Sequence, residues 1–199
     1  MSTITASDVK ALRDRTGAGM MACKNALAES DGDIEQAVEL LRARGEAQAA
    51  KRAGNEASEG TIQSYIHNGQ LGVLVEVDCE TDFVSRNDAF VAFAKDLALH
   101  IAGSPLTLAV SDDEVPADDV EREKRIYVEQ AADRPENVRE KVVEGKLNAW
   151  LNDVVLLRQK HIREDKYEGK TIEELRAKLA SETGENVVIR RFARFAVGG

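Results

Sequence analysis

The chain of 199 residues is long enough for one moderate domain and a smaller one, and its 43% hydrophobic and 32% charged residues are typical of a soluble globular protein. Its 36 acidic and 27 basic side chains give a net charge of -9, which would repel a phosphate backbone and argues against direct binding to nucleic acid. No apolar run approaches the roughly 18 residues of a membrane-spanning helix, and no signal peptide pattern opens the chain, so we expect no membrane association and a cytoplasmic location.

The first 45 residues are predicted to form three short helices. Thr5 and Asp8 have the spacing of a capping box at the start of the first helix. The glycines within residues 16–19 end that helix, a second helix covers 20–29, and Gly45 closes a third. Three helices in so few residues bury little apolar surface, so we interpret residues 1–45 as a docking module.

A linker and a hairpin follow the bundle. Residues 46–60 are rich in Ala, Gly, Lys and Glu without an apolar face, which indicates an exposed, partly helical linker between two domains. The hydrophobic period then changes to two, so that Ile62 and Ile66 share one face of a strand. Asn68-Gly69 is a strong hairpin signal, and the return strand over 71–79 has an apolar side chain at every second position.

The return strand leads into a short polar loop, residues 81–87, which holds one aromatic residue, Phe83. Such a Phe either packs back into the core or is presented to a partner, and from the local pattern alone the core is the more frequent outcome. A helix then extends to Gly103, with Asn87 or Asp88 as its N-terminal cap.

The remaining chain is predicted to be mostly helical. A highly charged helix lies within residues 111–133, and Pro135 suits the first turn of a longer helix. Residues 160–169 are polar and are interpreted as a loop. Thr171 and Glu174 then form a second capping box, at the start of a short helix.

The last segment, residues 186–197, alternates and is rich in β-branched and aromatic side chains, so it is predicted to be a strand. A hairpin near the start of the second domain and a strand at its end predict a small antiparallel sheet packed with helices. Residues 61–199 are therefore expected to form an α+β domain, and the whole chain belongs to the α+β class.

The residues that could carry chemistry do not form a recognisable site. His67, His100 and His161 lie on three different elements, and Cys23 and Cys79 lack the spacing of a zinc or redox motif. Each cysteine lies in an apolar pattern, which indicates buried thiols in a reducing compartment. We therefore expect no enzyme activity, no catalytic residues, no metal and no cofactor.

Two stretches resemble the signatures of one family. Residues 12–27, LRDRTGAGMMACKNAL, resemble the N-terminal signature of elongation factor Ts. The Thr81-Asp82-Phe83-Val84 segment, which the strand with Glu76-Val77 precedes, resembles the second signature of this family. The order and spacing of the two agree with the family, and the similarity continues to residues 190–195. On these motifs the chain is identified as a member of the elongation factor Ts family.

The resemblance implies a guanine nucleotide exchange factor for elongation factor Tu, the GTPase that carries aminoacyl-tRNA to the ribosome. The N-terminal bundle, similar to a ubiquitin-associated domain, would dock on the GTPase domain through Arg13, Met20 and Met21. The Thr81-Asp82-Phe83-Val84 segment would enter near the magnesium and nucleotide site, with its Phe as a wedge and its Asp as a polar partner. The resemblance thus implies that Phe83 is presented and not buried.

The chain departs from the family pattern at Asp78, where the family commonly has Asn, and at Lys160-His161, where many relatives have Pro-Phe. It is also shorter than members with a second half-module and a C-terminal helical extension. Short members of the family dimerise, so we expect a homodimer. Two other functions stay open: a module that binds and stabilises elongation factor Tu without exchange, and a small thiol enzyme built on Cys23 or Cys79.

Overall fold

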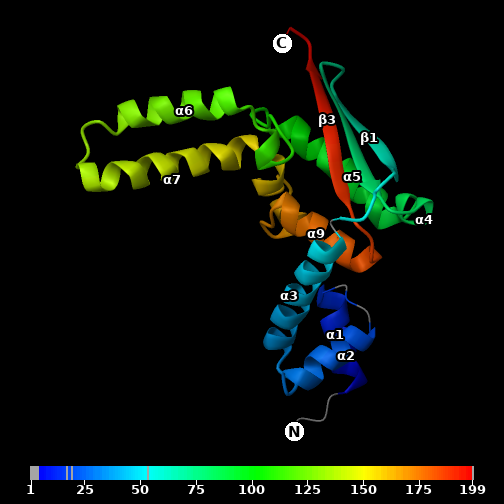
Figure 1. Ribbon diagram of the computed structural model, residues 1–199. Coiled ribbons are helices and arrows are strands. Elements are labelled where there is room, and N and C mark those ends of the chain that lie inside the picture. Colours follow the sequence, from blue (N-terminus) through cyan, green and yellow to red (C-terminus); the bar gives the residue numbers. More distant parts are fainter. Residues whose placement is uncertain (1–4, 17, 19, 53, 199) are drawn as a thin grey trace. The chain divides into compact units, whose positions relative to one another are not determined.

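The computed structural model describes residues 5–198 apart from 17, 19 and 53, and for residues 46–50 it describes the backbone only (Figure 1). The described chain divides into two compact units. The first contains the residues up to Gly60 together with Asp78–Phe90 and Arg176–Val188, and the second contains Thr61–Val77, Val91–Leu175 and the residues from Ile189 onward. The predicted domain boundaries at 45 and 60 stay a prediction.

The first unit begins with a bundle of three helices, α1 (Ala6–Thr16), α2 (Met20–Glu29) and α3 (Ile34–Arg52). The predicted capping box is confirmed, since the Thr5 N–H donates to Asp8 Oδ2 at 2.9 Å and the Asp8 N–H donates to Thr5 Oγ1 at 3.2 Å. The bundle core consists of small and medium side chains, namely Val9, Leu12, Cys23, Ala26, Leu27 and Ala37.

The prediction that Gly45 ends the third helix is wrong, because α3 continues through this residue to Arg52. A glycine inside a helix costs only about 1 kcal/mol relative to alanine, which is not enough to stop it. Gly45 has a packing role instead: a Cβ at this position would lie 3.0 Å from Ser181 Oγ. The missing side chain therefore lets α3 approach α9 (Ile172–Thr183) within the first unit.

The sheet contains β1 (Glu59–His67), β2 (Leu71–Cys79) and β3 (Val188–Ala196), and these antiparallel strands lie in the order β1-β2-β3. The predicted hairpin is confirmed, with Asn68 at φ 49° and Gly69 at φ 67°, the left-handed conformations that Asn and Gly tolerate. The α+β class is therefore confirmed.

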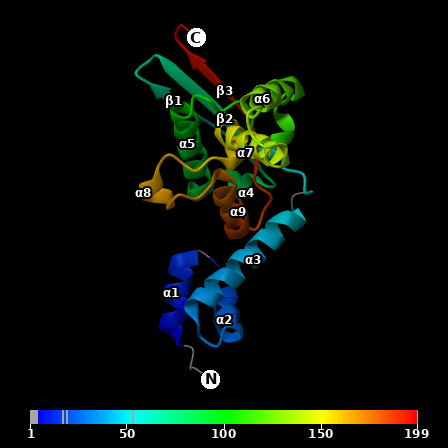
Figure 2. The ribbon, with the colours of Figure 1, turned by 90° about the vertical axis from the view of Figure 1, so that its left-hand side faces the viewer.

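One face of the sheet is buried and the other is open. Val73, Val75 and Val77 are almost fully buried, as the alternation of β2 predicts. Helix α5 (Asp88–Gly103) lies alongside the sheet in both views (Figures 1 and 2), and its buried side chains recur at helical spacing from Phe90 to Ile101. The Ala89 N–H donates to Asn87 Oδ1 at 2.8 Å, so Asn87 is the cap of this helix.

Two long helices of the second unit, α6 (Ala117–Gln130) and α7 (Glu136–Val154), pack side by side as a helical hairpin (Figure 1). A short 3-10 turn, η1 (Asp112–Glu114), precedes the pair, and another, η2 (Leu156–Arg158), follows it. Pro135 is at the N-terminal cap of α7, in agreement with the prediction. A small cluster of buried side chains, Ala109, Val115, Val154 and Val155, closes the base of the hairpin.

The predicted loop over 160–169 contains a one-turn helix, α8 (Glu164–Tyr167), and polar contacts fix it to α5. The Asp96 carboxylate binds Lys166 and accepts a hydrogen bond from the Tyr167 hydroxyl at 2.5 Å. His161 is 2% exposed, and its ring centroid lies 4.4 Å from that of Tyr167. His161 thus contributes a buried imidazole ring to the second unit.

Candidate functional site

The segment that the sequence singles out is a single helical turn and not the predicted loop. Helix α4 (Asp82–Ser85) begins after Thr81, whose extended backbone and side chain cap it, because Thr81 Oγ1 accepts from the Val84 N–H at 3.5 Å. The Ser85 N–H donates to the Thr81 carbonyl at 3.2 Å and closes the turn. The turn thus begins directly after β2, because the extended Thr81 that follows this strand caps it.

The side chains of this segment differ sharply in exposure. Phe83 is 84% exposed, while its neighbour Val84 is 6% exposed and anchors the turn in the interior. The expectation that Phe83 is not buried is therefore confirmed, and the local core alternative is wrong for this residue. Asp82 lies beside Arg86, with 3.1 Å between Oδ2 and the guanidinium nitrogen, and both side chains are largely exposed.

Glu185, which sequence reasoning missed, binds the start of this turn from the far end of the chain. Its Oε2 accepts from the backbone N–H groups of Glu80 and Thr81, each at 3.0 Å, and its Oε1 accepts from the Thr81 hydroxyl at 2.6 Å. Gly184, at φ 73°, turns the chain after α9 and so brings Glu185 to this position. No local pattern could reveal a contact across 104 residues.

A second carboxylate, that of Glu80, binds the chain next to Glu185. Glu80 Oε1 accepts from the Asn186 N–H at 2.6 Å, and Glu80 Oε2 accepts from the Asn55 side chain at 3.0 Å. The bond from Asn186, followed by the one from Asn55, holds the pKa of the Glu80 carboxyl below its usual value. The Asn186 side chain in turn donates to the Asn55 carbonyl at 3.0 Å. We name the residues Asn55, Glu80, Glu185 and Asn186 the carboxylate clamp.

The predicted docking residues lie on the surface of the bundle. Arg13 is an exposed residue of α1, and Met20 and Met21, at the start of α2, are 50% and 67% exposed. Two adjacent methionines that are half or more exposed supply adaptable apolar surface, which suits binding to a partner. Their joint role in docking stays a prediction.

Neither cysteine is placed for reactivity. Both are fully buried, and Cys79 donates to the Thr81 carbonyl at 3.2 Å. Burial raises the pKa of the Cys79 thiol to about 11, and the Glu185 carboxylate adds to the effect. Within the described part of the chain, no group of three or more His, Cys, Asp or Glu is arranged to hold a metal ion.

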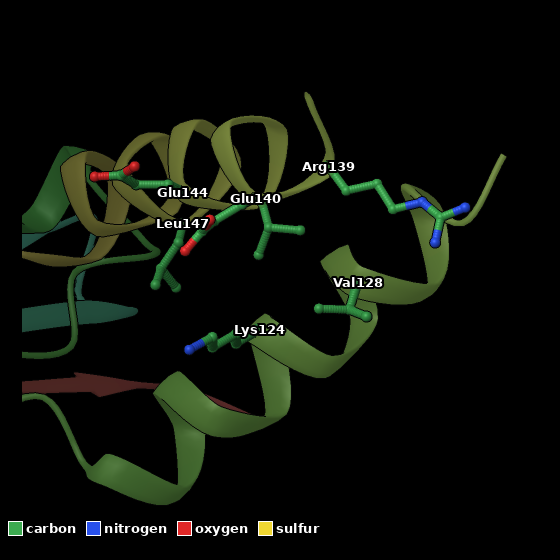
Figure 3. Close-up of a pocket in the computed structure, with 7 residues that line it drawn as sticks. Lys124, Val128, Arg139, Glu140, Glu144 and Leu147 are labelled. Carbon is green, nitrogen blue, oxygen red and sulfur yellow. The ribbon is translucent and has the colours of Figure 1, made fainter. Parts of the chain in front are cut away.

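A groove of about 530 Å³ lies between α6 and α7 (Figure 3). Lys124 and Val128 line it from α6, and its α7 wall includes Arg139, Glu140, Glu144 and Leu147. Its lining combines two basic and two acidic side chains with apolar ones, so the groove has no charge preference. It contains none of the predicted site residues.

Comparison with known proteins agrees with the two signatures. A family model described as Elongation factor TS matches residues 5–168. Elongation factor Ts of Desulfotalea psychrophila is 52% identical over 198 residues, and the match covers 98% of both chains. Elongation factor Ts of Geobacter sulfurreducens is 49% identical, covering 98% of this chain and 90% of the relative. Elongation factor Ts of Acaryochloris marina is 48% identical, covering 100% of this chain and 83% of the relative.

Among the described residues no helix is both long and apolar enough to cross a membrane. The signatures, the α+β fold and the nearly full-length similarity lead to one conclusion: the chain belongs to the elongation factor Ts family, whose members are translation elongation factors.

Proposed function

We propose that the protein binds elongation factor Tu in its GDP-bound form, in the cytoplasm, and promotes release of GDP and exchange for GTP without chemistry of its own. The observation that carries the proposal is Phe83, an aromatic side chain left 84% exposed at the tip of a capped turn in the second family signature. A large apolar side chain held in water by a fixed backbone is suited to entering a partner.

Exchange requires differential binding, because a factor that binds the nucleotide-free and the GDP-bound GTPase equally well shifts no equilibrium. Releasing a tight nucleotide about 10⁴-fold faster requires roughly 5.5 kcal/mol of coupling. Burying one Phe contributes only about 1.5–3 kcal/mol. Phe83 therefore acts together with other contacts, and Arg13, Met20 and Met21 are the residues we propose for docking.

The Thr81-Asp82-Phe83-Val84 segment is proposed to enter near the magnesium site of the GTPase, with Asp82 as the polar partner of Phe83. Loss of the magnesium ion would remove a large positive charge that neutralises the nucleotide phosphates. Thr81 and Val84 would hold the turn, since one caps it and the other anchors it in the interior. The partner would thus lose GDP through electrostatics as well as through displacement.

We further propose that the protein is a homodimer that pairs through the open face of its sheet. Ile62, Ile66 and Phe195 are 64%, 63% and 69% exposed, and Leu74 is 48% exposed. The alternation of side chains along each strand places all four on one face. Two cross-strand contacts lie on this face: a Cβ added at Gly72 would lie 3.1 Å from Ile66 Cδ1, and Arg191 binds Glu76 at 2.5 Å. An apolar face of this kind suits a two-fold pairing with a second copy.

Release of a fluorescent GDP analogue from elongation factor Tu, chased with unlabelled nucleotide, tests the proposal. The protein, added below one equivalent, is expected to accelerate release of all the bound analogue, because each molecule acts repeatedly. Binding without acceleration would contradict exchange and would favour the stabilising module. Acceleration that stops at one event per molecule would contradict turnover.

A further inference from the structure

We propose that Glu185 is a positioning residue for nucleotide exchange: through the carboxylate clamp it fixes the turn that carries Phe83. This inference deepens the proposed function and rests on it. Glu185 lies outside both family signatures and is far in sequence from the residues it orients.

The contacts of Glu185 leave the start of α4 little freedom. The two backbone N–H groups that precede the turn and the Thr81 hydroxyl all point to one carboxylate. The Thr81 carbonyl is bound as well, by the Cys79 thiol at 3.2 Å and by the Ser85 N–H at 3.2 Å. Hydrogen bonds to an ionised acceptor are stronger than neutral ones, so Glu185 is the dominant constraint on Thr81.

A turn of four residues has too few internal hydrogen bonds to hold its own direction. Phe83 makes few contacts in the free protein, since 84% of its surface is exposed, and its own packing therefore does not fix its position. The backbone that precedes Phe83 must therefore fix the position of its side chain. If this backbone relaxes, the Phe samples many directions and only a fraction of molecules can enter the partner productively.

The clamp also reaches the segment that follows α3. Asn55 donates to Glu80 and accepts from Asn186, and the Asn55 N–H donates to the Arg52 carbonyl at 2.8 Å. Three stretches of the first unit, which are distant in sequence, thus meet at two carboxylates. This arrangement sets the turn relative to the end of α3, the last helix of the proposed docking bundle.

Three variants of the full chain test the inference. Glu185→Ala removes all three hydrogen bonds to the turn. Glu185→Gln keeps the shape, and its amide can accept from the N–H groups while donating to Thr81 Oγ1, so the bonds remain but lose their charge. Glu182→Ala is the matched control, because it also removes one negative charge. Glu182 is an exposed residue of α9, and its partner is Lys178 at 3.6 Å.

Each variant is measured in three ways: amide hydrogen exchange of Glu80 and Thr81 in the free protein, affinity for GDP-loaded elongation factor Tu, and maximal rate of GDP release. Glu185→Ala is expected to raise amide exchange at Glu80 and Thr81 at least about 10-fold and to lower the release rate at least about 10-fold. Its affinity for the GDP-loaded partner should change little. Glu185→Gln should fall between Glu185→Ala and the wild type, and Glu182→Ala should match the wild type.

Unchanged amide exchange at Thr81 in Glu185→Ala, or a wild-type rate of GDP release, would overturn the inference. Equal loss of release rate and affinity would also overturn it, since it would show a general role in folding or docking. If Glu185→Ala does not fold, Glu185→Gln decides by the same measurements. If the wild type itself does not accelerate release, the proposed function fails, and amide exchange alone decides whether the clamp holds the turn.

Discussion

Acidification should destabilise the protein through His100, a buried histidine that folding keeps neutral. His100 is 1% exposed; its Nε2 lies 2.8 Å from Gln159 Oε1, and its Nδ1 accepts from the Ile162 N–H at 3.2 Å. The ring therefore carries its proton on Nε2. A second proton on Nδ1 would face the Ile162 N–H, donor against donor, in an interior that disfavours charge.

The size of the effect follows from the shift of the His100 pKa. Burial is the main cause that lowers this pKa from 6.5 to about 4, and the nearby His161 ring adds to it. The unfolded chain binds a proton below pH 6.5, while the folded chain does so only below about 4, so stability is complete above pH 6.5 and falls as the pH drops between these values. At about 1.4 kcal/mol per pH unit, the loss from this residue by pH 4 is about 3 kcal/mol.

Urea unfolding of the wild type and of His100→Gln from pH 7 to pH 4 measures this loss. The variant is expected to be less stable at pH 7, because the Ile162 N–H loses its acceptor, but to lose about 3 kcal/mol less on acidification. His67→Gln, at an exposed histidine, is the control and should follow the wild type. Parallel curves for the wild type and His100→Gln would refute the reasoning.

Three further predictions concern Phe83, the sheet and the thiols. Phe90→Ala, at a fully buried side chain, should lower the free energy of unfolding by about 3–5 kcal/mol, whereas Phe83→Ala, at an 84% exposed one, should change it by less than about 0.5 kcal/mol; similar losses in urea unfolding would contradict the placement of Phe83. Ile66→Lys should convert a dimer into monomers in analytical ultracentrifugation, while Lys160→Glu, at an exposed residue outside the sheet, should not; a monomeric wild type or a dimeric Ile66→Lys variant would refute the proposed pairing. Cys23 and Cys79 should resist alkylation at pH 7.5 until the protein unfolds, and replacing both with alanine should preserve GDP release; loss of release in a folded variant would revive the thiol enzyme alternative.

Local patterns were sufficient to predict most elements of the fold. The capping boxes at Thr5 and Thr171, the Asn68-Gly69 turn and the alternation of β2 each depend on residues within a few positions of one another. Gly45 shows where such patterns fail, because the sequence predicts a helix end at this residue and the structure instead packs it against the Ser181 side chain. A packing requirement set by a residue distant in sequence leaves no local trace.

The candidate site shows the same limit. The signature at 81–84 indicates where the site lies, but only the resemblance implies that Phe83 is exposed, since the local pattern alone favours burial. The carboxylate clamp depends on contacts across more than 100 residues, such as those from Thr81 to Glu185 and from Glu80 to Asn186. Glu185 looks like an ordinary surface glutamate in sequence, because a carboxylate carries no sign of the backbone groups it will bind.

The measurement that tests the wedge role of Phe83 most directly compares release with docking for Phe83→Ala. GDP release is measured at saturating concentrations of the wild type and the variant, and affinity is measured for GDP-loaded elongation factor Tu. Because burying one Phe contributes about 1.5–3 kcal/mol, the variant is expected to release GDP about 10- to 150-fold more slowly. Its affinity for the GDP-loaded partner should stay close to that of the wild type. Equal loss of both quantities, or an unchanged release rate, would contradict the role of Phe83 as the wedge.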